Sequence, residues 1–211
     1  MKRWLVRAMA MAVLALLAGA SPALARSAFK VGLDERQLSG AAYTHDNGTT
    51  KLENSDLLVA TQLTLEFLPT ESFGLEVAYA LSPLQRNYQL GANGATSSNV
   101  LEEASYVLYG ANYYLFRDDR QGLHPLIGVA TGTIGVTQKF EGGTLGSTST
   151  AATVNVNVLK LGMEWVGEKA GLRLIYESWS GQSSNATKLA GIRQTNNYTG
   201  TSIVLGVFIN G

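Results

Sequence analysis

The stretch LLVATQLTLEFL at residues 57–68, followed four residues later by FGLEVAYAL at residues 73–81, decides the fold. In both segments hydrophobic side chains occupy every second position, and the positions between them hold small or polar residues, Leu58 and Leu68, and the carboxylates Glu66 and Glu76. Successive side chains of a β-strand point to opposite faces, so this alternation predicts two strands, each with one oily and one mixed face. The intervening residues 69–72 predict a short turn between them.

The same alternation recurs less evenly in six further segments, which brings the expected number of strands to eight. Gly is abundant, with 23 residues, and Pro is scarce, with 4, as is typical of many strands joined by sharp turns. The chain is therefore expected to be all-β. The six further segments are residues 37–43, 105–116, 125–139, 154–166, 171–179 and 198–209.

The connections between these segments alternate in length. Short turns at one rim, long loops at the other and an even number of antiparallel strands are typical of bacterial outer-membrane barrels. Lipid offers no hydrogen-bond partner to a sheet edge, so a sheet that faces lipid must close. We therefore predict an eight-stranded antiparallel up-and-down transmembrane β-barrel. The short connections are residues 69–72, 117–124 and 167–170, and the long ones, rich in Gly, Ser, Thr and Asn, are residues 44–56, 82–104, 140–153 and 180–197.

The first 25 residues predict export. A basic head with Lys2, Arg3 and Arg7 precedes an apolar stretch at residues 8–20 and a small-residue cleavage site at residues 23–25. A transmembrane helix is the alternative, but about 20 apolar residues are needed to span a bilayer, and Gly, Ser and Pro interrupt this stretch. The expected organisation is a cleaved signal peptide, residues 1–25, and an outer-membrane barrel domain, residues 26–211.

Composition excludes several function classes. Removing the three basic residues of the signal peptide leaves 13 Lys and Arg against 16 Asp and Glu, so the expected mature chain is mildly acidic and nucleic acid is not an expected partner. The chain has no Cys and two His, and it contains no dinucleotide, phosphate-loop, zinc-protease or calcium-loop motif. We therefore expect neither a cofactor nor a metal.

A soluble periplasmic barrel that turns its oily face inward around a ligand is the alternative fold. Such a barrel should carry charge on its outer face. The charges within the expected strands instead lie opposite the oily face, together with Gly and Ala. This arrangement favours a barrel whose crowded polar face is the interior.

A two-residue turn at residues 168–169 would fix the register of the strands on either side of it. Cross-strand partners point to the same face of a sheet. In this register Glu164 lies opposite Arg173, and Lys160 lies opposite Glu177. An unpaired charge enclosed by the barrel wall would be strongly unfavourable, so we predict these two ion pairs in the lumen.

A second group of polar residues is expected in the same interior. A three-residue turn at residues 70–72 would set Glu66 opposite Glu76, either as an acid/base pair or as part of a structural network with a nearby Lys or Arg. Asn112 and Tyr114 are expected to join them. An eight-stranded barrel is just wide enough for its own side chains, so a wide pore is not expected.

Outward aromatic side chains near the strand ends are expected to form the interfacial girdles of the barrel. Those near the short turns are Phe67, Phe73, Tyr113 and Trp165, and those nearer the loops are Tyr79 and Tyr176.

Three segments, residues 63–80, 113–119 and 123–129, resemble the strand–turn–strand elements of small outer-membrane β-barrel proteins, and within them most nearly the OmpW-like barrels. This resemblance implies a narrow conduit for small hydrophobic compounds. The sequence departs from these proteins in the number of its lumenal charges, and its end at residues 208–211 lacks the terminal aromatic that the barrel-assembly machinery recognises.

Three functions remain open. The first is a structural or interaction role through long extracellular loops around a filled, salt-bridged lumen. The second is the hydrophobic conduit. The third is a lipid A-modifying enzyme, but no His stands two residues before a Ser, and His45 is the remaining candidate base. We expect no enzyme. We expect a monomer in contact with outer-membrane lipid, lipopolysaccharide and, during insertion, the barrel-assembly machinery.

Overall fold

The computed structural model describes residues 29–46, 51–90, 98–115, 121–142, 148–183, 187–189 and 192–211. The predicted signal peptide, residues 1–25, lies outside these ranges. Within them, no helix is long and apolar enough to cross a membrane. The strands of this part are β1 (Phe29–Asp46), β2 (Lys51–Thr70), β3 (Phe73–Ala80), β4 (Leu84–Leu90), β5 (Ser98–Tyr114), β6 (Gly122–Glu141), β7 (Thr148–Val166), β8 (Ala170–Ser183), β9 (Thr187–Leu189), β10 (Ile192–Asn197) and β11 (Gly200–Asn210).

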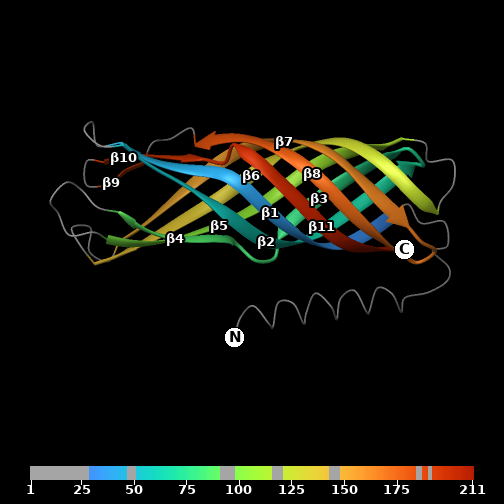
Figure 1. Cartoon of the computed structure of the whole chain (residues 1–211), viewed down its shortest axis with the longest axis horizontal. Coiled ribbons are helices and arrows are strands. Elements are labelled where there is room, and N and C mark those ends of the chain that lie inside the picture. Colours follow the sequence, from blue (N-terminus) through green and yellow to red (C-terminus); the bar gives the residue numbers. More distant parts are fainter. Residues whose placement is uncertain are drawn as a thin grey trace.

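Eight of these strands close into a barrel (Figure 1). Their order is β11-β1-β2-β3-β5-β6-β7-β8, and the pairing of β11 with β8 closes the ring. All of the pairings are antiparallel. The predicted fold, an all-β eight-stranded antiparallel barrel, is confirmed.

The other three strands lie at the end of the barrel opposite the C-terminus (Figure 1). β4 follows β3 after a break at residues 81–83 and pairs with residues 98–104 of β5. β10 continues β11 in the same way, because β1 pairs with β11 through residues 30–39 and with β10 through residues 42–46. β9 forms a hairpin with β10.

The wall strands are longer than the sequence pattern predicted. β2 and β6 have 20 residues each, and β1 begins at Phe29 rather than at residue 37. Much of the expected loops at residues 82–104 and 180–197 is strand, in β4, β5, β8, β9 and β10. The prediction of long connections there was therefore wrong in extent, because the wall itself extends beyond the oily segments.

The first short turn differs in detail from the expectation. Thr70 pairs with Phe73 across a two-residue turn, and a register shift between Phe67 and Thr70 takes up the extra residue. Glu66 therefore still lies opposite Glu76, although the predicted three-residue turn is wrong.

The polarity of the two faces inverts along the wall strands, as β7 illustrates. Near its turn with β8, the outward residues between Leu159 and Trp165 are apolar, whereas Lys160 and Glu164 point inward and are buried. Farther from that turn, the outward residues are polar and the inward ones are valines. The outward polar residues there are Thr153, Asn155 and Asn157, and the inward residues are Val154, Val156 and Val158.

The same inversion occurs around the barrel and divides it into two halves. In β6 the outward residues change from Ile127 and Val129 to Thr131 and Thr133, and in β1 they change from Leu33 to Glu35. The half next to the short turns, here called the turn-side half, is apolar outside and encloses the buried charges beside a small apolar cluster of Tyr114, Leu126, Ile175 and Val204. The other half, here called the loop-side half, is polar outside and encloses an apolar core, as in a water-soluble protein. Its core includes Leu38, Leu58, Ala80, Leu84, Ala104, Ile134, Val136, Val154, Val156 and Trp179.

Candidate functional site: the lumen and the apolar belt

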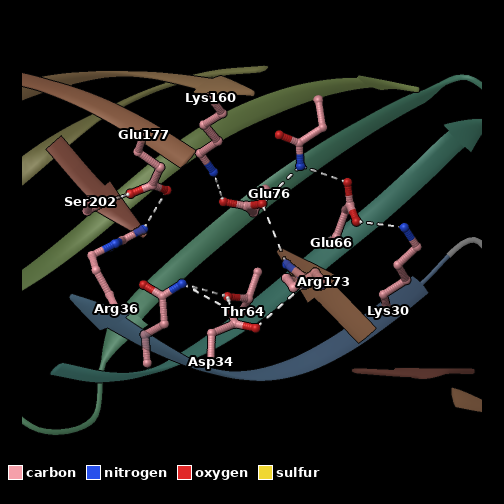
Figure 2. Close-up of polar contacts among 12 residues, drawn as sticks. Lys30, Asp34, Arg36, Thr64, Glu66, Glu76, Lys160, Arg173, Glu177 and Ser202 are labelled. Atoms are coloured by element: carbon pink, nitrogen blue, oxygen red, sulfur yellow. Dashed lines mark hydrogen bonds and ion pairs between the residues drawn. The ribbon is translucent and has the colours of Figure 1, made fainter. Parts of the chain in front are cut away.

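Charged side chains fill the turn-side half of the lumen (Figure 2). Each of these side chains is at most 5% exposed. They come from five strands, so their contacts inside the lumen link strands that lie far apart in the sequence. Carboxylates exceed basic groups by one, and the ion pairs of this network use every one of them. Its members are Lys30, Asp34, Arg36, Glu66, Glu76, Lys160, Glu164, Arg173 and Glu177.

Lys30 of β1 lies at the centre of the end nearest the turns. Its Nζ lies 3.2 Å from a carboxylate oxygen of Glu66 and also forms an ion pair with Glu164. It donates a hydrogen bond of 2.9 Å to the hydroxyl oxygen of Tyr114 and lies 4.2 Å from the centroid of that ring. One ammonium group thus forms ion pairs with two carboxylates from two different strands, and Arg173 is a second cation beside Glu164.

Glu66 and Glu76 belong to the same network. The amide nitrogen of Asn112 donates hydrogen bonds of 2.9 Å to both carboxylates, and Lys160 forms an ion pair with Glu76. With Lys30 on Glu66, each carboxylate has its own cation. Of the two interpretations of this pair, the geometry favours the structural network.

Arg173 of β8 joins three carboxylates. Its Nε lies 3.6 Å from Asp34 and 3.7 Å from Glu164, and its Nη1 lies 4.0 Å from Glu76. Asp34 in turn accepts hydrogen bonds from the side chains of two residues of β2, Gln62 at 3.1 Å and Thr64.

A glycine makes the approach of Arg173 and Asp34 possible. Gly206 of β11 lies between them in the sheet, and a Cβ at this position would overlap Asp34 and lie 3.1 Å from Arg173. We expect Gly206→Ala to lower the free energy of unfolding by about 1–3 kcal/mol through overpacking. Gly135→Ala is the matched control, since its nearest atom would be the carbonyl oxygen of Ser105 at 3.9 Å. Urea unfolding of both variants in lipid vesicles checks this, and equal losses would contradict it.

Arg36 closes the network toward the loop-side half. Its Nη2 donates to Glu177 at 2.8 Å, and its guanidinium carbon lies 4.9 Å from the ring centroid of Tyr106 and 4.8 Å from that of Trp179. Trp179 also donates from Nε1 to Glu177 at 2.9 Å. Beyond this layer the apolar core of the loop-side half begins, so two successive layers of different chemistry fill the lumen.

The register predicted across the turn at residues 168–169 is confirmed. Glu164 lies opposite Arg173 and Lys160 opposite Glu177. Glu164 and Arg173 form the predicted ion pair. The predicted pair of Lys160 with Glu177 is wrong, because Lys160 pairs with Glu76 and Glu177 pairs with Arg36. In so narrow a barrel the long side chains reach across the lumen as readily as along the wall.

Sequence reasoning missed three members of the network, Lys30, Asp34 and Arg36. All three precede the first expected strand, which began at residue 37. Their signal is the same alternation, because they share the inward face of β1 while Phe29 and Leu33 point outward or lie half-exposed. A run with so many charges was not recognised as a strand.

Of the two histidines, the structure describes the side chain of one. His124 is buried in the lumen, in register with Glu164. The side chain of His45 lies outside the described residues. Among the described side chains, no group of three His, Cys, Asp or Glu could hold a metal ion.

The six aromatic residues expected in the girdles lie on the outer surface of the turn-side half. They are 37–54% exposed and share that surface with many aliphatic side chains. Together these outward apolar residues form a continuous band around the barrel, here called the belt. The six aromatic positions are Phe67, Phe73, Tyr79, Tyr113, Trp165 and Tyr176.

Comparison with protein-family models finds no match, and no curated protein matches the chain. Among solved structures, Neisserial surface protein A (NspA) has 12% identity and a TM-score of 0.52, covering 88% of this chain and 98% of its own. OprG of Pseudomonas aeruginosa has 11% identity and a TM-score of 0.52, covering 87% and 95%. The chain has the fold of the small outer-membrane β-barrel proteins. At these identities the likeness extends to the fold alone, and the nearer resemblance to OmpW-like barrels stays a prediction.

The belt shows how an outer-membrane barrel with this sequence is seated. Apolar surface on this scale is unfavourable in water, whereas hydrocarbon covers it without cost. The belt surrounds the turn-side half of a closed wall, which leaves no unpaired sheet edge to the lipid there. The closed wall and the belt are those of a barrel that spans a membrane through its turn-side half, with the loop-side half beyond the hydrocarbon.

Proposed function

We propose that this outer-membrane barrel is a sealed scaffold, with a structural or interaction role that it performs through the loop-side half and the connections at its rim. The observation that carries the proposal is the double filling of the lumen. A charged network lies within the belt, and an apolar core lies directly beyond it.

The charged layer argues against a conduit for hydrophobic compounds. An apolar solute on the barrel axis would have to separate Lys30 from its carboxylates and then displace Arg36 from Glu177. Breaking buried ion pairs is strongly unfavourable, because each leaves a charge without a partner. The OmpW-like role is therefore the less favoured candidate.

The loop-side half supports an interaction role. Its outer face on β6 and β7 presents hydroxyl and amide side chains beyond the belt, and its apolar core makes this wall firm. A rigid wall that holds loops away from the membrane is a common arrangement for binding surfaces. Lipopolysaccharide and outer-membrane lipid are the nearest partners that we propose for it. We further propose that residues 1–25 direct export, that the assembly machinery inserts the barrel, and that it works as a monomer.

Single-channel recording in planar bilayers tests the sealed lumen. We expect the protein to give no conductance steps above noise. The matched variant is Arg36→Ala combined with Trp179→Ala, which removes the two large side chains that meet where the charged network borders the apolar core, and it should produce small steps.

Steps from the unmodified protein would overturn the proposal in favour of a narrow channel. If neither protein gives conductance steps, and heat-modifiable gel migration shows that both are folded, other residues of the lumen form the seal.

A further inference from the structure

An open groove of about 750 Å³ crosses the outer surface of the belt. Its floor is the backbone of the row in which Asp34, Gly206 and Arg173 are cross-strand partners. These side chains point into the lumen, so the groove itself is lined by outward residues on either side of that row, and the lining is almost entirely apolar.

Two cross-strand rows form its walls. One row pairs Leu33 with Val207, Val207 with Leu172, and Leu172 with Trp165. The other pairs Glu35 with Leu205, and Leu205 with Leu174. The groove therefore crosses the strands, from β1 through β11 and β8 to β7 and β6.

The groove runs obliquely across the belt, from the loop-side boundary toward the short turns. Its β1 end lies where the outward residues change from Leu33 to Glu35, and its other end lies at Trp165, two residues from the turn at Gly167. Four steps between neighbouring strands make it about 19 Å long. One leaflet contributes about half of a hydrocarbon core of roughly 30 Å, so the groove can hold one acyl chain along most of its length.

The end at the belt boundary carries a carboxylate. Glu35 is exposed and accepts a hydrogen bond of 3.1 Å from the amide nitrogen of Gln37, and no cation pairs with it among the residues that the structure describes. Glu103, by comparison, lies on the outer face of β5 and pairs with Lys139 at 3.4 Å. An unpaired carboxylate at the membrane boundary attracts an ammonium group.

We propose that this groove binds one lipid whose headgroup carries a primary amine, with an acyl chain between the two apolar rows and the ammonium group on Glu35. The inference depends on the position of the belt in the membrane and is independent of whether the lumen is sealed. It adds a specific lipid site to a surface that would otherwise hold lipid without preference.

Quenching of Trp165 by lipids with brominated chains tests this, since Trp165 lines the groove. The protein in non-ionic detergent micelles is titrated with phosphatidylethanolamine or with phosphatidylcholine, which has the same net charge and no N–H donor. Quenching that disappears in Trp165→Phe is assigned to the groove. We expect half-maximal quenching at about a threefold lower mole fraction of phosphatidylethanolamine, as befits one exposed ion pair.

Two pairs of variants make the result specific. Glu35→Gln should remove the preference for phosphatidylethanolamine, whereas Glu103→Gln should leave it unchanged. Val207→Phe fills the groove and should weaken quenching by both lipids, whereas Val77→Phe on the far wall should not. Superposed curves for the two lipids, or a preference that survives Glu35→Gln, would overturn the proposal.

Discussion

Replacing Lys30 by Met is expected to lower the free energy of unfolding by about 3–5 kcal/mol, because it leaves buried carboxylates without their cation. The side chain of Lys30 is fully buried and serves both Glu66 and Glu164. Methionine keeps much of the length and apolar volume of the side chain, so the loss reports the charge and its hydrogen bonds. Urea unfolding of the barrel in lipid vesicles, followed by tryptophan fluorescence, gives the measurement.

Lys139→Met is the matched control for this substitution. Lys139 also pairs with a glutamate, Glu103, but at 3.4 Å and with 53% of its side chain exposed. An exposed pair contributes little after solvent screening, so a loss of about 0.5 kcal/mol or less is expected. Adding Glu164→Gln to Lys30→Met should recover part of the stability. If the two lysine substitutions cost the same, the turn-side lumen is hydrated and the network is not a seal.

Leu161→Lys is expected to destabilise the inserted barrel by about 2–4 kcal/mol, the cost of a cation on the lipid face near the middle of the bilayer. Leu161 points outward from β7 within the belt and is 61% exposed. No substitution of the lumen is involved, so the charge acts through the lipid alone. The measurement is again the free energy of folding into vesicles.

Asn155→Lys on the same strand is its control. Asn155 points outward as well, six residues farther from the turn, where the outer face is already polar. We expect a cost of at most about 1 kcal/mol at or beyond the interface. Equal costs at the two positions would show that the belt does not end where the polarity inverts, and the boundary would have to be redrawn.

Much of the turn-side half could be predicted from the sequence, because its strands carry the simplest signal. In β2, β3 and the paired ends of β7 and β8, most outward residues are apolar, the inward residues include the charged ones, and a short turn joins each pair of strands. Parts of the loop-side half were missed, such as β4, β9 and β10, and the exchange of its two faces was not predicted. In β7 the apolar residues change from the outward to the inward face between Val158 and Leu159, and alternation alone does not show such a change of face.

The positions of the site residues could be predicted better than their contacts. Period two is enough to send Glu164 and Lys160 inward, but it says nothing of which opposite wall they meet. Lys160 finds Glu76 on β3, and its neighbour in register, Glu177, finds Arg36 on β1. Those choices depend on the width and closure of the barrel, which no local pattern contains.

The inversion of polarity also determines the depth at which the barrel sits. A shift of two residues along the strands moves the wall by roughly 5 Å along the membrane normal, given a rise of about 3.3 Å per residue and the usual strand tilt. Such a shift in one direction would draw Thr131, Asn157 and Glu35 into hydrocarbon, and in the other it would lift oily side chains such as Val129 into water. The barrel therefore has a single preferred immersion, which holds its outer rim at a constant height above the bilayer.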